Sequence, residues 1–145
     1  MGEMQSALDA LAAQDLFALP SGAVLARTAA LLQLANRVAA ELTRTVRHAD
    51  ATGAAEHDGK KTIASWLRGH GHLTPGEAGR VVRSGRALEH LPATAAAFAD
   101  GTVTASQVAA IAPIADDAAR AAADAQGVDL GAGRHRPGAG RCRAQ

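Results

Sequence analysis

The sequence contains few of the residues that build β-sheets. Of its 145 residues, three are aromatic, none is tyrosine, and isoleucine and valine together number 11. Strands favour β-branched and aromatic residues, whereas alanine and leucine favour helices. Since 38 residues are alanine, the composition excludes a β fold and predicts an all-α protein with a thin core.

Disulfides, membrane spans and leader peptides are also missing from the sequence. The single cysteine, Cys142, excludes an internal disulfide and fits a reducing compartment. No apolar run approaches the ~18 residues of a membrane-spanning helix. Residues 1–14 have neither the basic start nor the apolar stretch of a signal peptide. These absences predict a cytoplasmic protein with no membrane partner.

The net charge of +1 is unevenly distributed along the chain. Residues 127–145 hold four arginines against one aspartate, whereas the remaining residues carry a net charge of −2. Within that remainder, residues 60–86 are the exception, with six basic residues and a single acid, Glu77. The low overall charge argues against disorder of the whole chain, and the basic segment stands out as a candidate binding surface.

A long helix is predicted near the N-terminus, from about residue 22 to about residue 51. Ser21 is a suitable N-cap for it and Gly53 a suitable C-terminal glycine. Apolar side chains recur every seven residues along one face and others widen the row; they are Val24, Leu31 and Val38, with Leu25, Leu32, Leu42 and Val46. We expect this face to be buried, so that aspartate at Leu31 unfolds the thin core. A second helix must cover the face, and self-association through the long helix would supply one.

Shorter helices are predicted around the long one. Residues 3–16 form a short amphipathic helix, and residues 54–59 form a polar linker. Three helix starts follow, each with a capping threonine; these are Thr62, Thr74 and Thr104. Together these signals predict a small helical bundle.

The last helices are predicted from proline and acidic residues. A short helix covers residues 93–99, and Pro113 kinks or ends the helix after it. Residues 116–126 could form one more alanine-rich helix, with Asp116 and Asp117 as its N-cap and first-turn acid.

Composition divides the chain into residues 3–126, a helical domain that is incomplete at its C-terminal end, and residues 127–145. The second segment has five glycines, four arginines and no periodicity. It is interpreted either as a disordered basic tail or as GC-rich DNA translated out of frame.

The basic segment contains the candidate nucleic-acid-binding residues. A short helix with Trp66, a break at residues 69–72 and a capped second helix resemble a helix-turn-helix layout. Arginines three apart on the second helix follow one face, and guanidinium groups suit phosphate. The candidate set is Lys60, Lys61, Arg68, Arg80, Arg83 and Arg86. The alternative interpretation is a solvated face that keeps an alanine-rich helix soluble.

Other reactive residues form no recognisable site. His70 and His72 could ligate a metal, but a structural zinc site needs four ligands, which favours a polar turn. Cys142 lies between two arginines in a segment without fixed geometry. No Ser–His–Asp arrangement and no phosphate-binding glycine loop is visible. The sequence predicts no catalytic residue, metal, cofactor or small-molecule ligand.

An ordered series of short motifs runs through the middle of the chain. The motifs are Ser65-Trp66-Leu67, Leu73-Thr74-Pro75, Arg80-Val81-Val82-Arg83, Leu91-Pro92-Ala93-Thr94, Asp100-Gly101 and Gln107-Val108. Together with the long helix, the series resembles the actinobacterial domain-of-unknown-function family that commonly precedes an HNH endonuclease domain, the mycobacterial repeat-family proteins. The resemblance covers roughly residues 8–115.

This resemblance implies an α-helical region of unassigned role, followed in many members by a nuclease with His-Asn-His chemistry on a metal ion. No nuclease residue can be carried over, because Asn36 in the long helix is the chain's single asparagine. Three hypotheses follow. The chain is a non-catalytic module that binds DNA for a nuclease, a helical interaction or oligomerisation module, or a truncated fragment without function.

Overall fold

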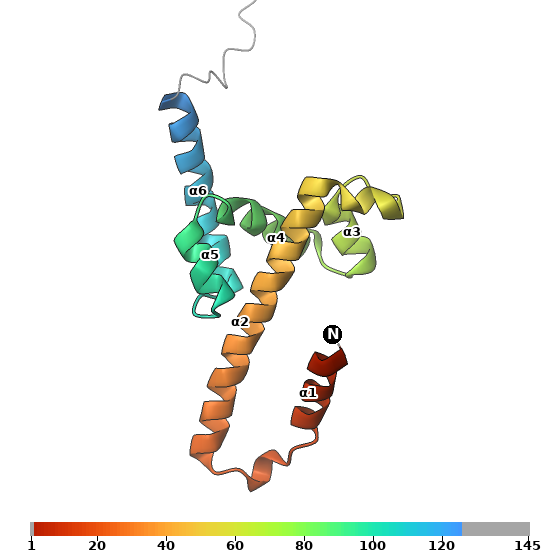
Figure 1. Cartoon of the computed structure of the whole chain (residues 1–145), viewed down its shortest axis with the longest axis vertical. Coiled ribbons are helices and arrows are strands. Elements are labelled where there is room, and N and C mark those ends of the chain that lie inside the picture. Colours follow the sequence, from red (N-terminus) through yellow and green to blue (C-terminus); the bar gives the residue numbers. More distant parts are fainter. Residues whose placement is uncertain (1, 126–145) are drawn as a thin grey trace, which may run out of the picture.

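The computed structural model describes residues 2–125, which contain six α-helices, two short 3-10 helices and no strand. In chain order they are α1 (Gly2–Ala12), η1 (Leu16–Ala18), α2 (Ser21–Thr52), η2 (Ala54–Asp58), α3 (Ile63–His70), α4 (Pro75–Leu88), α5 (Pro92–Ala99) and α6 (Ala105–Ala125). The predicted all-α bundle with one long helix is confirmed (Figure 1). Residues 127–145, Cys142 among them, lie outside the described residues.

The long helix α2 starts at Ser21, one residue earlier than predicted, so its cap is Pro20. Pro20 has an extended backbone, and its carbonyl accepts the first helical hydrogen bonds from the amides of Ala23 and Val24. Ser21 is therefore the first helical residue, and the prediction that its side chain caps the helix is wrong. Gly53 ends the helix as predicted, with φ of +68° and its amide donating to Ala49.

Threonine caps begin three of the later helices, as predicted. The Thr62 hydroxyl accepts from the Ser65 amide at 3.1 Å, and Thr74 and Glu77 form a reciprocal capping box. Thr104 and Gln107 exchange the same two bonds, at 2.8 and 3.2 Å. These bonds satisfy amides that have no partner inside their helices, so the three starts are fixed locally.

Three local expectations are corrected. Residues 54–59 are not a linker, because residues 54–58 form η2 with Ala55 buried. The predicted helix over residues 3–16 ends at Ala12. Helix α6 continues through Pro113 to Ala125, so no separate helix begins at Asp116, and Asp116 and Asp117 lie inside α6. Ala112 and Ala115, on either side of the proline, are both buried, which holds the two parts in one helix.

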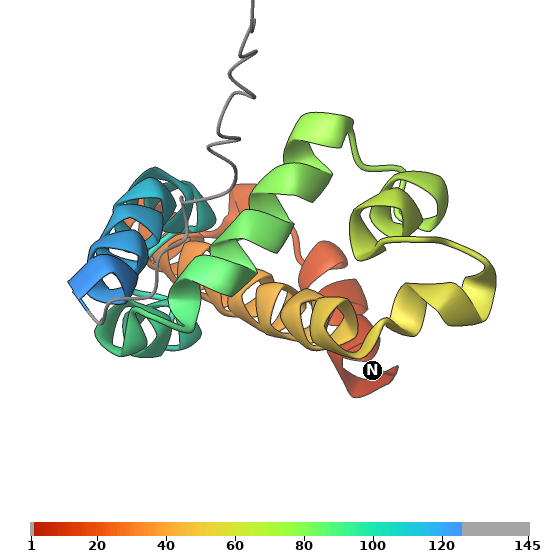
Figure 2. The ribbon, with the colours of Figure 1, turned by 90° about the horizontal axis from the view of Figure 1, so that it is seen from above.

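The core is centred on α4, which lies between α3 and α6 and packs across the C-terminal half of α2 (Figure 2). One buried cluster joins α2, α3 and α4; it consists of Val46, Ile63, Leu67, Ala78 and Val82. A second joins α4 to α6 through Ala87, Ala112 and Ala115. Phe98 and Val108 are the largest fully buried side chains among the described residues, so the core is as thin as the composition predicts.

The N-terminal half of α2 extends away from this core, with α1 beside it (Figure 1). We call α1, η1 and α2 as far as residue 42 the arm. Its predicted apolar seam is buried at the C-terminal end of α2, where Val46 is 4% exposed, but Leu31 is 37% exposed. The prediction of a buried seam is therefore wrong for Leu31, Val38 and Leu42, which are exposed, while Val24 is half-buried. The residues of α2 that pack against α3 and α4 lie nearer its C-terminal end, at Val46 and beyond.

No helix among residues 2–125 is both long enough and apolar enough to span a bilayer.

Candidate nucleic-acid interface

Helices α3 and α4 form the helix-turn-helix-like segment that the sequence predicts. Residues 71–74 join them, and Gly71 and Leu73 both donate their amides to the carbonyl of Leu67. His72, in the turn, takes the left-handed conformation, with φ of +54°. The pair is held together by the cluster of Ile63, Leu67, Ala78 and Val82. A short helix, a tight turn and a longer second helix are thus packed as one unit.

The basic residues of this segment lie mostly at the surface. Five are exposed; they are Lys61, Arg68, Arg80, Arg83 and Arg86, while Lys60 is half-buried. Lys60 lies along α3, since its Cε is 3.6 Å from the place where a Cβ on Gly69 would stand. Among the described residues no ion pair engages the two lysines, Arg68, Arg80 or Arg83. Five cationic groups therefore surround α3 and α4 without a carboxylate partner.

The outer face of α4 consists of arginines and glycines. Arg80 and Arg83 lie one turn apart, with Gly76 and Gly79 beside them. A Cβ on Gly76 would meet nothing within 4 Å, and one on Gly79 would meet the Arg83 guanidinium at 3.1 Å. Glycine at position 79 thus leaves room for the Arg83 guanidinium to lie against α4, whereas the surface beside Gly76 is open.

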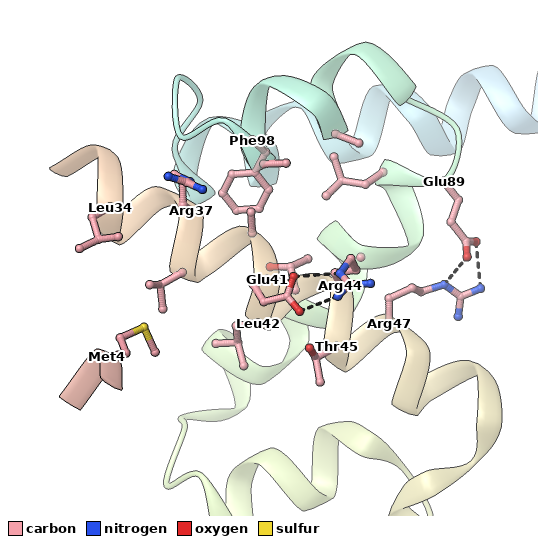
Figure 3. A pocket seen from close by; sticks show the side chains of 17 residues that line it. Met4, Leu34, Arg37, Glu41, Leu42, Arg44, Thr45, Arg47, Glu89 and Phe98 are labelled. Carbon is pink, nitrogen blue, oxygen red and sulfur yellow. Dashed lines mark hydrogen bonds and ion pairs between the residues drawn. The ribbon is translucent and has the colours of Figure 1, made fainter. Parts of the chain in front are cut away.

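Arg86 differs from the other five because it is already paired. Its guanidinium donates to both carboxylate oxygens of Asp50, at 2.8 and 3.0 Å. Asp50 also accepts from Arg47 at 3.2 Å, and Arg47 holds Glu89 through two bonds of 2.7 and 2.9 Å (Figure 3). This network ties α2 to α4. Arg86 thus differs from the other members of the candidate set, and we assign it a structural role.

The ion-pair network makes stability depend on pH. The hydrogen bond from Arg86 lowers the pKa of Asp50, and the charges of Arg86 and Arg47 act in the same direction against its desolvation. The bond from Arg47 likewise lowers the pKa of Glu89. A carboxyl group with a depressed folded pKa stabilises the fold fully above its unfolded pKa of about 4. That contribution is lost as pH falls through the lower folded pKa.

We expect Asp50→Asn to lower the free energy of unfolding by about 1–2 kcal/mol at neutral pH, because Arg86 and Arg47 lose a charged acceptor that is only 14% exposed. Urea unfolding followed by circular dichroism measures the change. The difference from the unsubstituted chain should shrink as pH falls below about 4. Glu41→Gln is the matched control, because the Glu41–Arg44 pair is exposed and should contribute little. Equal losses in both variants would contradict a stabilising network.

A second polar cluster surrounds Trp66. Its indole nitrogen donates to Asp58 at 2.6 Å, and its ring stacks on His70 at 4.9 Å between centroids. His57 lies 3.0 Å from the same carboxylate. The indole hydrogen bond, followed by that of His57, lowers the pKa of Asp58. Sequence patterns gave no sign of this cluster, which joins η2 to α3.

The described residues contain no group of three or more His, Cys, Asp or Glu side chains placed to hold a metal ion. His70 stacks on Trp66, and His72 forms the turn before α4.

Comparison with family models gives one match. The model for a domain of unknown function, DUF222, covers residues 23–135. The chain therefore belongs to this family, which confirms its resemblance to a domain-of-unknown-function family. Comparison with curated proteins found no match, and neither did comparison with solved structures.

Proposed function

We propose that this chain is a non-catalytic helical module that binds duplex DNA through α3 and α4. The observation that carries the proposal is the set of unpaired cationic groups around a helix-turn-helix-like pair. The proposed phosphate contacts are Lys60, Lys61, Arg68, Arg80 and Arg83. Following its resemblance to HNH-associated proteins, we further propose that the module holds DNA for a nuclease, and that it acts in the cytoplasm.

The local charge balance supports this assignment. The one acid of the segment, Glu77, is held at the start of α4, since its carboxylate accepts from the amide and hydroxyl of Thr74 at 2.8 and 2.7 Å. Its charge acts on Arg80, but it is one negative charge against five positive ones. Arg80 and Arg83 stand one turn apart on the exposed face of α4, beside the open surface at Gly76. Guanidinium groups bind phosphate in a bidentate manner, and such contacts position a protein on DNA without reading its sequence.

The rest of the molecule limits the affinity. Residues 1–126 carry a net charge of −2. The electric field of this net charge repels DNA and opposes the attraction of the basic residues around α3 and α4. We therefore expect affinity no tighter than micromolar, nearly the same for all duplex sequences.

Salt dependence tests the proposal. With about four phosphates neutralised, log K should fall against log salt with a slope of roughly −3.6. Fluorescence anisotropy of a labelled duplex, titrated with the full chain at several salt concentrations, gives this slope. The control is to replace the four arginines of residues 127–145 by glutamine. This removes charge outside the proposed surface, so the slope of log K against log salt should keep most of its value.

Two results would overturn the proposal. One is the absence of binding at low salt by a chain whose circular dichroism shows that it is folded. The other is loss of the whole slope on replacing the arginines of residues 127–145, because DNA would then be held by that segment alone.

A further inference from the structure

We propose that the arm is a dimerisation surface and that it binds the arm of a second copy of this chain in antiparallel orientation. The proposal starts from the seven-residue apolar row of α2. At its C-terminal end the row is covered, with Val46 at 4% exposure, whereas Leu32 in the arm is 63% exposed. Leu25, Leu31, Leu34, Val38 and Leu42 are exposed in the same stretch of helix. Contiguous exposed apolar surface of this kind marks sites of protein association.

Helix α1 does not cover this surface. Met4 and Leu8 are themselves exposed, although Met4 lines the same groove as Leu34 and Val38. Arg27 holds α1 to α2 by donating to the carbonyl of Leu11 at 2.7 Å and to the side chain of Gln14. The groove between α1, α2 and α5 encloses about 1060 Å³ (Figure 3). The two helices of the arm thus present an open apolar face.

The apolar side chains of the arm indicate what kind of partner can bind there. The occupant must supply a long row of large apolar side chains. Residues 126–145 contain two, Val128 and Leu130, among glycines and arginines, so they cannot supply such a row. The arm of a second copy can, because it carries the same seven-residue repeat, the spacing by which helices pair. Residues 21–42 extend about 33 Å and the 11 residues of α1 about 17 Å, and each helix is about 10 Å wide.

The arm thus offers about 500 Å², less than the roughly 800 Å² that each partner contributes to a standard interface, which fits a weak dimer that forms at micromolar concentration. Two arms would form a four-helix arrangement of two α1 and two α2 helices. One two-fold axis relates the copies, so each apolar row meets its own symmetry mate.

Charge selects the antiparallel orientation. Arg27 and Glu41 lie two heptads apart on the same edge of the apolar row. In an antiparallel two-fold pair, equal edges of the two helices meet, which brings Arg27 of one copy to Glu41 of the other, twice. A parallel pair would instead leave Arg27 and Glu41 at different levels of the two helices, so the two charges would not meet.

Sedimentation velocity of the full chain, kept reduced so that Cys142 forms no disulfide, tests the proposal. We expect a monomer–dimer equilibrium that shifts to dimer between low and high micromolar concentration. Leu32→Asp should raise the dissociation constant at least tenfold, because it buries a charge in the interface. Ile114→Asp is the matched control, since Ile114 is equally exposed at 65% but lies on α6, and it should leave the constant unchanged.

Circular dichroism must show that both variants are folded, and Leu25→Gln provides an uncharged second variant should Leu32→Asp fail to fold. A chain that stays monomeric at every concentration overturns the proposal and leaves the face to a different protein. Dissociation by Ile114→Asp but not by Leu32→Asp overturns it as well.

The orientation has its own matched pair of variants. Glu41→Arg should weaken the dimer, because it places arginine against Arg27 of the other copy. Arg44→Gln breaks the same intrachain pair, joined at 2.7 Å, but should leave the dimer intact. Equal weakening by both variants contradicts the antiparallel arrangement.

Discussion

Replacing Gly101 by alanine is expected to lower the free energy of unfolding by about 2–4 kcal/mol. Gly101 ends the turn after α5 with φ of +82°, a conformation that side chains with a Cβ rarely adopt. A Cβ at this position would lie 2.5 Å from the backbone oxygen of Gln33 in α2. The turn is held in place, because the side-chain amides of Gln33 and Asn36 donate to the backbone carbonyls of Asp100 and Gly101. The substitution therefore combines backbone strain with a clash between two helices.

Gly59→Ala separates the two causes. Gly59 has φ of +69°, but a Cβ there would meet nothing within 4 Å, so only the backbone strain of about 1–2 kcal/mol remains. Urea unfolding of both variants under the same conditions measures the difference. Similar losses for Gly101→Ala and Gly59→Ala would show that the turn does not pack against α2.

Replacing Phe98 by alanine is expected to lower the free energy of unfolding by about 3–5 kcal/mol. Phe98 is 1% exposed and is one of the two largest fully buried side chains in the described part of the chain. It also lines both the large groove and a cavity of about 350 Å³ beside α4. Truncation therefore leaves a void that joins these two spaces, in a core otherwise built largely of alanine and valine.

Phe17→Ala is the matched control, because Phe17 in η1 is fully exposed. The same change of side chain should alter stability by no more than about 0.5 kcal/mol there. Thermal unfolding followed by circular dichroism compares the two variants. A melting temperature that falls as much for Phe17→Ala as for Phe98→Ala would contradict the assigned core.

The sequence was sufficient to predict what short-range hydrogen bonds determine. The caps at Thr62, Thr74 and Thr104 bond to residues three positions away, and Gly53 ends α2 through a bond to Ala49. Each of these signals lies within one turn of helix. The helical type and the starts of α3, α4 and α6 could therefore be predicted without knowledge of the packing.

Contacts between distant segments could not be predicted in this way. Arg86 looks like an unpaired arginine in the sequence because its partner, Asp50, lies 36 positions away. The apolar row of α2 has one pattern throughout, but α3 and α4 cover only its C-terminal end. Likewise, η2 looked like a polar linker, because the packing that buries Ala55 comes from other elements. Periodicity shows which face of a helix is apolar but not which part of that face is covered.

The most direct test of DNA binding through α3 and α4 compares two arginines on one helix. Arg83 is unpaired and Arg86 is bound to Asp50, so only Arg83 is available for a phosphate. The measurement is the slope of log K against log salt for the full chain and for Arg83→Ala and Arg86→Ala, at a temperature where all three are folded. The account predicts that Arg83→Ala flattens the slope by about 0.9 and weakens binding to all sequences alike, while Arg86→Ala leaves the slope unchanged. An unchanged slope in Arg83→Ala, or equal flattening in both variants, would contradict it.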